Sequence, residues 1–223
     1  MNNAQFYIQL AIGSILISNF VLAKFLGFCP FFGVTRKMSD SIGMGLAVIF
    51  VMVLASAVTS LVYRHLLLPS SPEHTNLLSL VGLPVPEGGY VLVLKTISYI
   101  LIIAGLVQFV EMVLRKNVPN LYRAMGIYLP LITTNCAVFG VALLNTEAWR
   151  DPANGLPVGK AAFNGAAGGV GFLLAMVLMS SIRERLEESR VPRTLRGLPI
   201  AFICGGLMAL AFFGFQKLFG IAV

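Results

Sequence analysis

Two cysteines at matching places in the chain are the residues best suited to chemistry. The hexapeptide Cys29–Val34 (CPFFGV) has a counterpart, Cys136–Val141 (CAVFGV), 107 positions later, and each lies within an apolar stretch. Thiolates are soft ligands for iron, zinc and copper, and an ionisable group without a partner is costly inside a membrane. Two equivalent thiols at such depth are therefore either inert and buried or ligands of a metal.

The spacing of the cysteines alone does not define a metal site. Iron–sulfur clusters usually need four thiolates, and the close Cys-x2-Cys spacing of ferredoxins is absent from the sequence. A second, related polypeptide with an equivalent pair would supply the missing ligands. Cys204 has no counterpart in the other half and lies beside Gly205 and Gly206, so we expect it to be a small packing residue.

The composition predicts an integral membrane protein. Of the 223 residues, 57% are hydrophobic and only 11% are charged, far from the balance of a soluble domain. The net charge is +7, but Lys and Arg gather in short segments between apolar runs, which indicates membrane topology and not nucleic-acid binding. The sequence contains no Ser-His-Asp arrangement, Walker loop or dinucleotide fingerprint, so we expect no catalytic residue in this chain alone.

Apolar segments of the length that a membrane-spanning helix needs, about 20 residues, recur along the chain. Lys and Arg are concentrated after the first, third and fifth segments, so these connections are expected in the cytoplasm and both termini outside. We predict an all-α integral membrane fold with six transmembrane helices. The segments are residues 5–27, 41–64, 90–114, 121–145, 161–182 and 198–220.

The two cysteine motifs also predict an internal duplication. The shift of 107 positions aligns Leu22 with Leu129 as well, and downstream spans rich in Gly and Ala follow in the same order. Because each half holds three spans, an odd number, the second copy must enter the membrane in the opposite sense. We expect one membrane domain built as an inverted-topology 3+3 repeat, with residues 1–115 and 116–223 as its halves.

The first and fourth spans, which carry the cysteines, are the least regular. Gly27 and Pro30 flank Cys29, and Pro130 and the polar run 133–135 precede Cys136, so interrupted helices are predicted in both spans. Glycines of the second, fifth and sixth spans are expected to allow close helix packing. These are Gly43, Gly45, Gly165, Gly168, Gly169, Gly171, Gly205 and Gly206.

Charged residues at the edges of the spans have simple explanations. Lys24 lies within the first span, five positions before Cys29, and is expected either to reach the membrane interface or to offset negative charge nearby. Glu111 and Arg115 have the spacing of a helix-surface pair, which is favoured over an ion path. The run from Arg183 to Glu188 is expected to extend the fifth helix into the cytosol, with its charges solvated.

Several segments closely resemble the A subunits of the Rnf electron-transport complexes. They are Asn19–Pro30, Ser41–Ala47, Leu129–Asn145, Arg183–Arg185 and Gly206–Phe212. The resemblance extends to the related E-type chain of the sodium-pumping NADH:quinone oxidoreductase, but the Cys-Pro pair and the Thr-Thr-Asn-Cys run favour Rnf. Two outer loops, approximately 66–89 and 147–160, are longer than is typical of the family.

The resemblance implies both a site and a set of partners. In that family two homologous six-span subunits of opposite topology face each other, and each gives two cysteines to a 2Fe-2S cluster buried in the membrane. Carried over by motif, the metal ligands are Cys29 and Cys136, and we expect Lys24, Thr134 and Asn135 to surround the cluster. The implied partners are the Rnf E subunit, the other Rnf components B, C, D and G, and the lipid bilayer. The resemblance also implies that the chain lies in the inner (cytoplasmic) membrane of a bacterial or archaeal cell.

The resemblance also implies a function. The complex is an ion-translocating ferredoxin:NAD oxidoreductase of the translocase class, coupled to Na⁺ or H⁺ transport, and this chain would carry electrons across its membrane part. Two other functions remain open. Secondary transporters also build sites from inverted repeats and interrupted helices, with the cysteines then incidental, and a purely structural protein would use the duplicated motif for packing. A reducible iron–sulfur signal distinguishes the redox function from both.

Overall fold

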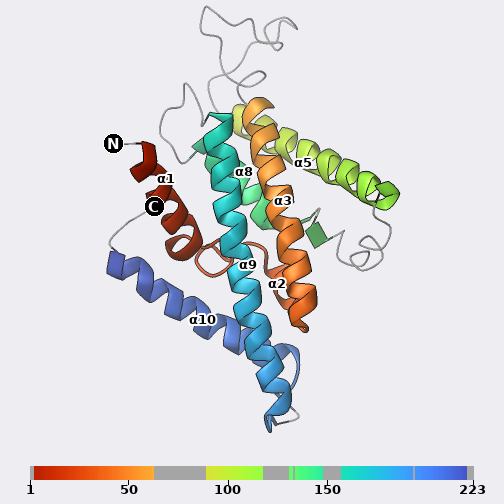
Figure 1. Cartoon of the computed structure of the whole chain (residues 1–223), viewed down its shortest axis with the longest axis vertical. Coiled ribbons are helices and arrows are strands. Elements are labelled where there is room, and N and C mark those ends of the chain that lie inside the picture. Colours follow the sequence, from red (N-terminus) through yellow and green to blue (C-terminus); the bar gives the residue numbers. More distant parts are fainter. Residues whose placement is uncertain are drawn as a thin grey trace, which may run out of the picture.

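The structure is a computed structural model that describes residues 3–62, 89–117, 131–132, 134–147, 157–192 and 194–219. Within these ranges every regular element is a helix (Figure 1), as the sequence predicts. Most of the two long outer loops and the first part of the fourth span lie outside the described residues. The elements are α1 (Asn3–Ile12), the π-helix η1 (Gly13–Ile17), α2 (Phe28–Val34), α3 (Met38–Val62), α5 (Gly89–Asn117), α8 (Cys136–Glu147), α9 (Val158–Glu188) and α10 (Leu198–Phe219).

Helices α3 and α9 run side by side through the centre of the fold and make the largest helix–helix contact in the described part. Their glycines make this approach possible. A Cβ on Gly165 would lie 2.8 Å from the backbone oxygen of Met52, and one on Gly169 would lie 2.9 Å from the Cα of Ile49. Because Cβ atoms are not tolerated so close to a backbone, the predicted packing role of these glycines is confirmed.

Other glycines divide into those that pack and those that do not. Gly45 faces the side chain of Leu173, and a Cβ on Gly205 of α10 would lie 3.1 Å from the ring of Phe32. Gly43 and Gly206 have no neighbour within 4 Å of such a Cβ among the described residues. Close packing at Gly43 and Gly206 is therefore not seen within the described part of the chain.

Two of the predicted spans are long and apolar enough to cross a membrane, and both belong to the central pair, α3 with 25 residues and α9 with 31. At the places of the other four spans the described residues form shorter apolar helical stretches of 10–17 residues. The six-span 3+3 arrangement and its halves stay predictions. These stretches are Tyr7–Ile17, Thr96–Phe109, Cys136–Asn145 and Leu198–Gly214.

The first predicted span is interrupted, as its sequence indicates. The π-helix η1 ends at Ile17, and no helix resumes until α2 begins at Phe28. Asn19 holds the break together: its Oδ1 accepts from the N–H groups of Val21 and Leu22, and its Nδ2 donates to the Gly171 carbonyl of α9 at 2.7 Å. Backbone at membrane depth needs such partners because no water is available there.

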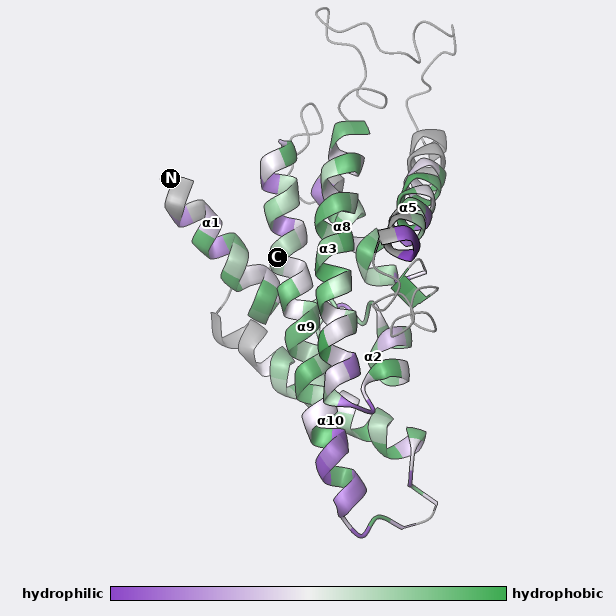
Figure 2. Ribbon diagram, turned by 45° about the vertical axis from the view of Figure 1, so that its right-hand side comes forward, coloured by the Kyte–Doolittle hydropathy of each residue, from purple (hydrophilic) through white to green (hydrophobic). Residues whose placement is uncertain are grey.

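Apolar side chains cover both the inside and much of the outside of the helices. Figure 2 shows hydrophobic residues over most of α3 and α10, and hydrophilic ones at the lower end of α9. Outward-facing residues include Leu101 of α5 and Leu210 of α10, which are 74% and 69% exposed. Such surfaces are stable only against lipid or another apolar partner, which agrees with the membrane setting predicted from composition.

Candidate functional site

Both cysteines of the duplicated motif stand at the beginning of a short helix. Cys29 is the second residue of α2, and Cys136 is the first residue of α8. The N-terminal end of a helix carries partial positive charge from its unpaired N–H groups. Both sulfurs therefore lie where an anionic group, such as a thiolate bound to a metal, is electrostatically favoured.

The segments in front of the two cysteines are packed against each other. Gly27, two residues before Cys29, has φ +84°, and a Cβ there would lie 3.0 Å from Oδ1 of Asn135 and 3.3 Å from Cβ of Ala137. Asn135 and Ala137 are the two neighbours of Cys136. The structure thus joins two motifs 107 positions apart in the sequence, and both cysteine helices begin beside this contact.

The two cysteines are exposed in the single chain, whereas their motifs are buried. Cys29 and Cys136 are free and exposed, while Phe31 and Ala137 are 0% exposed. Neither thiol is buried in the single chain, so both sulfurs are accessible to a ligand or to a second polypeptide. Cys204, in contrast, is partly buried and packs against the hydrophobic core, as expected of a structural cysteine.

The donor set fits half of a thiolate cluster. Among the described residues, no three His, Cys, Asp or Glu side chains gather closely enough to hold a metal ion. Iron–sulfur clusters are held by four ligands, usually all cysteines. Two exposed thiols at the ends of adjoining helices match one half of that set, and their exposure leaves room for a second polypeptide to bring the other half.

Asn135 lies buried between the two motifs. Its Oδ1 accepts from the N–H of Ala137 at 3.0 Å, which caps the beginning of α8. Its Nδ2 is buried and has no hydrogen-bond partner in the described part of the chain. A buried amide without a partner costs about 1–3 kcal/mol, so Nδ2 is a donor left open to a group outside the described residues.

Thr134 and Lys24 lie nearby with different surroundings. Thr134 is exposed, and its carbonyl accepts a weak, 4.0 Å hydrogen bond from the thiol of Cys136. Lys24 is half-buried in the break of the first span, with Nζ 5.7 Å from the ring centre of Phe20, a cation–π contact. That Lys24, Thr134 and Asn135 surround a cluster stays a prediction.

Arg183 of α9 is a residue of the site region whose role the sequence did not reveal. Its Nη1 donates to the Phe32 carbonyl at 2.8 Å and to Oγ1 of Thr35 at 3.1 Å, at the C-terminal end of α2. The expectation of a solvated charge is therefore wrong for Arg183, which caps the helix that carries Cys29. The signals in the sequence were its place as the first charge after the apolar part of the fifth span and its presence in a segment that resembles the family.

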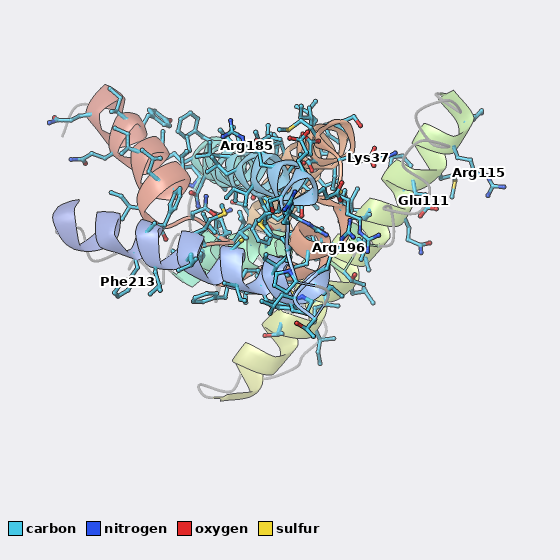
Figure 3. All side chains as sticks on the ribbon, turned by 90° about the horizontal axis from the view of Figure 1, so that it is seen from below. Lys37, Glu111, Arg115, Arg185, Arg196 and Phe213 are labelled. Carbon is cyan, nitrogen blue, oxygen red and sulfur yellow. The ribbon has the colours of Figure 1, made fainter. Side chains whose placement is uncertain are left out.

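The neighbouring Glu184 likewise binds the end of another helix, here the beginning of α3. Its Oε1 accepts from the N–H of Met38 at 2.8 Å, at the beginning of α3. The helical extension predicted for this run is confirmed, because α9 continues to Glu188. Figure 3, seen from below, shows Arg185 of the same run over the central helices, while Glu111 and Arg115 lie far from it along α5.

Aromatic rings enclose the helix that carries Cys29. The ring of Phe28 lies 5.5 Å from that of Phe25 and 5.4 Å from that of Phe32, measured between centroids. Phe32 also stacks at 4.3 Å on Phe202 of α10. These contacts keep water from one side of α2 and lower the local dielectric constant, two properties that tune the potential of a metal centre.

Comparison with known proteins places this all-α membrane fold with its paired thiols in a family. The family model described as "Rnf-Nqr subunit, membrane protein" matches residues 7–219. The chain is 50% identical over 209 residues to the A subunit of the "Na(+)-translocating ferredoxin:NAD(+) oxidoreductase complex" of Acetobacterium woodii, covering 94% of this chain and 96% of that protein. The chain therefore belongs to the Rnf-Nqr family of membrane proteins.

Two further relatives support the resemblance to the Rnf A subunits. The A subunit of the "Ion-translocating oxidoreductase complex" of Salmonella arizonae is 49% identical over 95% of this chain and 97% of its own length. The protein of the same name from Tolumonas auensis is 44% identical over 95% of this chain and 97% of its own length. The likeness inferred from the cysteine motifs is thereby confirmed.

Proposed function

We propose that this chain is the A-type membrane component of an ion-translocating ferredoxin:NAD oxidoreductase and that it holds half of a 2Fe-2S cluster. The names of its relatives support the complex. The observation that carries the cluster is the contact of Gly27 with both neighbours of Cys136, which brings two exposed thiols to adjoining helix ends. The remaining two thiolates come from the homologous Rnf E subunit.

Five residues of this chain have different roles in binding such a cluster. Cys29 and Cys136 bind iron as thiolates, and the positive ends of α2 and α8 offset the negative charge of the thiolates. Asn135 donates from Nδ2 toward the cluster, Thr134 adds a polar group beside Cys136, and Lys24 contributes positive charge. When bound, the cluster accepts and releases one electron at a time.

The thickness of the membrane explains why a membrane protein should hold such a site. The bilayer core is about 30 Å thick, too far for one rapid electron transfer. A carrier between the two membrane faces divides the crossing into shorter steps. The chain then acts as an electron conduit of a translocase-class complex coupled to Na⁺ or H⁺ movement, in an inner membrane with both termini outside and the Rnf components B, C, D and G as further partners.

The three cysteines provide a matched experiment. The complex is purified with wild-type chain, with Cys29→Ser and with Cys204→Ser, and its iron content and electron paramagnetic resonance spectrum are measured. Cys29→Ser should abolish the signal of the shared cluster, because oxygen is a poor substitute for a thiolate ligand. Cys204→Ser should retain it. An unchanged signal in Cys29→Ser would falsify the proposed ligand, and a complex lacking this cluster altogether would favour a transporter or a structural role.

A further inference from the structure

A second polar site, separate from the cysteines, lies at the C-terminal end of α9. An open cavity of about 410 Å³ is lined by the last turns of α9, the connection after α2 and the beginning of α10. Its polar lining is formed by three arginines, Arg36, Arg183 and Arg196, with one carboxylate, Glu187. Figure 3, seen from below, shows Arg196 beside the end of α10 that meets the central helices.

The charge of this cavity is unbalanced. Three guanidinium groups face a single carboxylate across a small space, and like charges held together repel unless an anion lies between them. Arg183 already donates through Nη1 to α2, so the rest of its guanidinium faces the cavity region together with Arg36 and Arg196. Guanidinium groups bind phosphate through paired, parallel hydrogen bonds, which ammonium groups cannot form.

The backbone fixes one of these arginines in place. Gly197 has φ +102°, a left-handed conformation that glycine adopts without strain. The N–H of Ile200 donates to the carbonyl of Leu195 at 3.1 Å and closes the turn. Arg196 is therefore presented by a defined turn that leads directly into α10, whose positive N-terminal end adds to the field.

The apolar part of the lining indicates an amphiphile and not a free anion. Leu186, Val191 and Ile200 form the rest of the wall. From Ile200 the same face of α10 continues with Ile203, Leu207 and Leu210, which are 50%, 62% and 69% exposed. Residues spaced by three, seven and ten positions lie on one side of a helix. A hydrophobic stripe thus runs from the cavity along α10.

We propose that this cavity binds the phosphate of an anionic phospholipid, with the acyl chains lying along the exposed stripe of α10. The depth is suitable, because the apolar part of α9 ends where Arg183 begins the charged run and lipid headgroups lie at that boundary. Basic pockets between membrane helices are known to take such headgroups. Since Arg183 also caps α2, the bound lipid touches a residue that holds the Cys29 helix.

The test uses the purified, delipidated complex in neutral detergent. Binding of phosphatidylglycerol and phosphatidylcholine is measured by native mass spectrometry, with inorganic phosphate as a separate ligand. The variant Arg36→Gln/Arg196→Gln removes two exposed arginines of the cavity but leaves Arg183 in place. Arg185→Gln is the control, because Arg185 lies on α9 like Arg183 but is exposed and does not line the cavity. Elution with the partner proteins shows that each variant is assembled.

We expect phosphatidylglycerol to bind the wild-type complex and the Arg185→Gln complex with equal affinity. Its affinity for the double variant should be lower by about tenfold or more, because each basic group near an anionic headgroup contributes substantially to binding. Equal binding by the double variant, or an equal loss in Arg185→Gln, contradicts the site.

Two further results would show that the cavity binds something other than lipid. If inorganic phosphate binds as tightly as phosphatidylglycerol, the cavity is a free-anion site. No lipid binding in the complex, with an acidic segment of another protein of the complex cross-linked beside Arg196, makes it a protein contact. Each of the last two results also overturns the lipid assignment.

Discussion

Two polar regions within the apolar part of this chain differ in how completely their groups are paired. In the first, the amide chain, Oγ of Ser14 donates to Oδ1 of Asn164 at 3.0 Å, and Nδ2 of Asn164 donates to Oδ1 of Asn145 at 2.7 Å. In the second, the cysteine region around Gly27 and Asn135–Cys136, a buried amide nitrogen has no described partner and both thiols are exposed.

This difference in hydrogen-bond pairing distinguishes a region that supports the fold from a region that binds another molecule. Buried polar groups that are fully paired hold helices together, and the amide chain does so between η1, α8 and α9. Groups left without partners reduce stability and persist where another molecule supplies the missing bond. We therefore interpret the cysteine region as a binding site and the amide chain as a support, and each prediction below probes one side of that contrast.

The largest effect is expected for Cys136→Ser. This change should abolish the cluster signal and the iron that belongs to it, because the chain then supplies one thiolate instead of two. The stability of the chain should hardly change, since Cys136 is exposed and its hydrogen bond to the Thr134 carbonyl is weak. Electron paramagnetic resonance and the thermal midpoint of the assembled complex measure the two effects. A retained signal contradicts the two-ligand assignment.

The second-largest effect is expected for Gly27→Ala. Alanine is strained at φ +84°, and its Cβ would lie 2.8 Å from the ring of Phe172, so we expect a loss of about 2–4 kcal/mol from backbone strain and overpacking together. The contact between the two cysteine motifs should loosen, and the cluster signal should broaden or fall.

Gly43→Ala is the matched control for this change. Gly43 lies within α3, and nothing stands within 4 Å of an added Cβ among the described residues, so alanine should be neutral or slightly stabilising there. Thermal denaturation of both variants gives the comparison. Equal midpoints for the two would mean that Gly27 does not hold the motifs in contact.

Asn164→Leu tests the amide chain. It should lower stability by less than Gly27→Ala does, and it should leave the cluster signal unchanged. It leaves Oδ1 of Asn145 and the hydroxyl of Ser14 without their partner, at a cost of about 1–2 kcal/mol in a membrane protein. The thermal midpoint should fall, while the cluster signal per folded complex stays at its wild-type level. Ser181→Ala, which removes only a bond to the Val177 carbonyl of its own helix, should change neither. A lost signal in Asn164→Leu would show that the amide chain is not merely a support.

The sequence predicted the interrupted first span and the glycines that pack α9 against α3 because both rest on local signals. Gly27 lies at the end of the break, which covers residues 18–27, whereas Pro30 lies in the first turn of α2, where proline is tolerated. The sequence could not predict the amide chain or the cap of α2. Ser14 and Asn164 are 150 positions apart, and Arg183 and Phe32 are 151 apart.

Long-range pairs of this kind depend on the tertiary fold, and their residue types have simpler local explanations. A charged run after an apolar helix is usually solvated, and Arg183 has the same residue type as Arg185, which is exposed. The exposure of both thiols could not be predicted for a related reason. It results from where α2 and α8 begin on the surface of the fold, which neither motif encodes by itself.

The smallest and most selective effect is expected for Asn135→Ser. Serine retains an oxygen that can cap α8 at the N–H of Ala137, so stability should change by only about 0.5 kcal/mol. It lacks the Nδ2 donor, however, and a cluster that loses a hydrogen bond to its sulfur becomes harder to reduce. A redox titration should therefore show a lower reduction potential with an intact signal. An unchanged potential would mean that Nδ2 does not face the cluster, and the unpaired amide would then require a different partner.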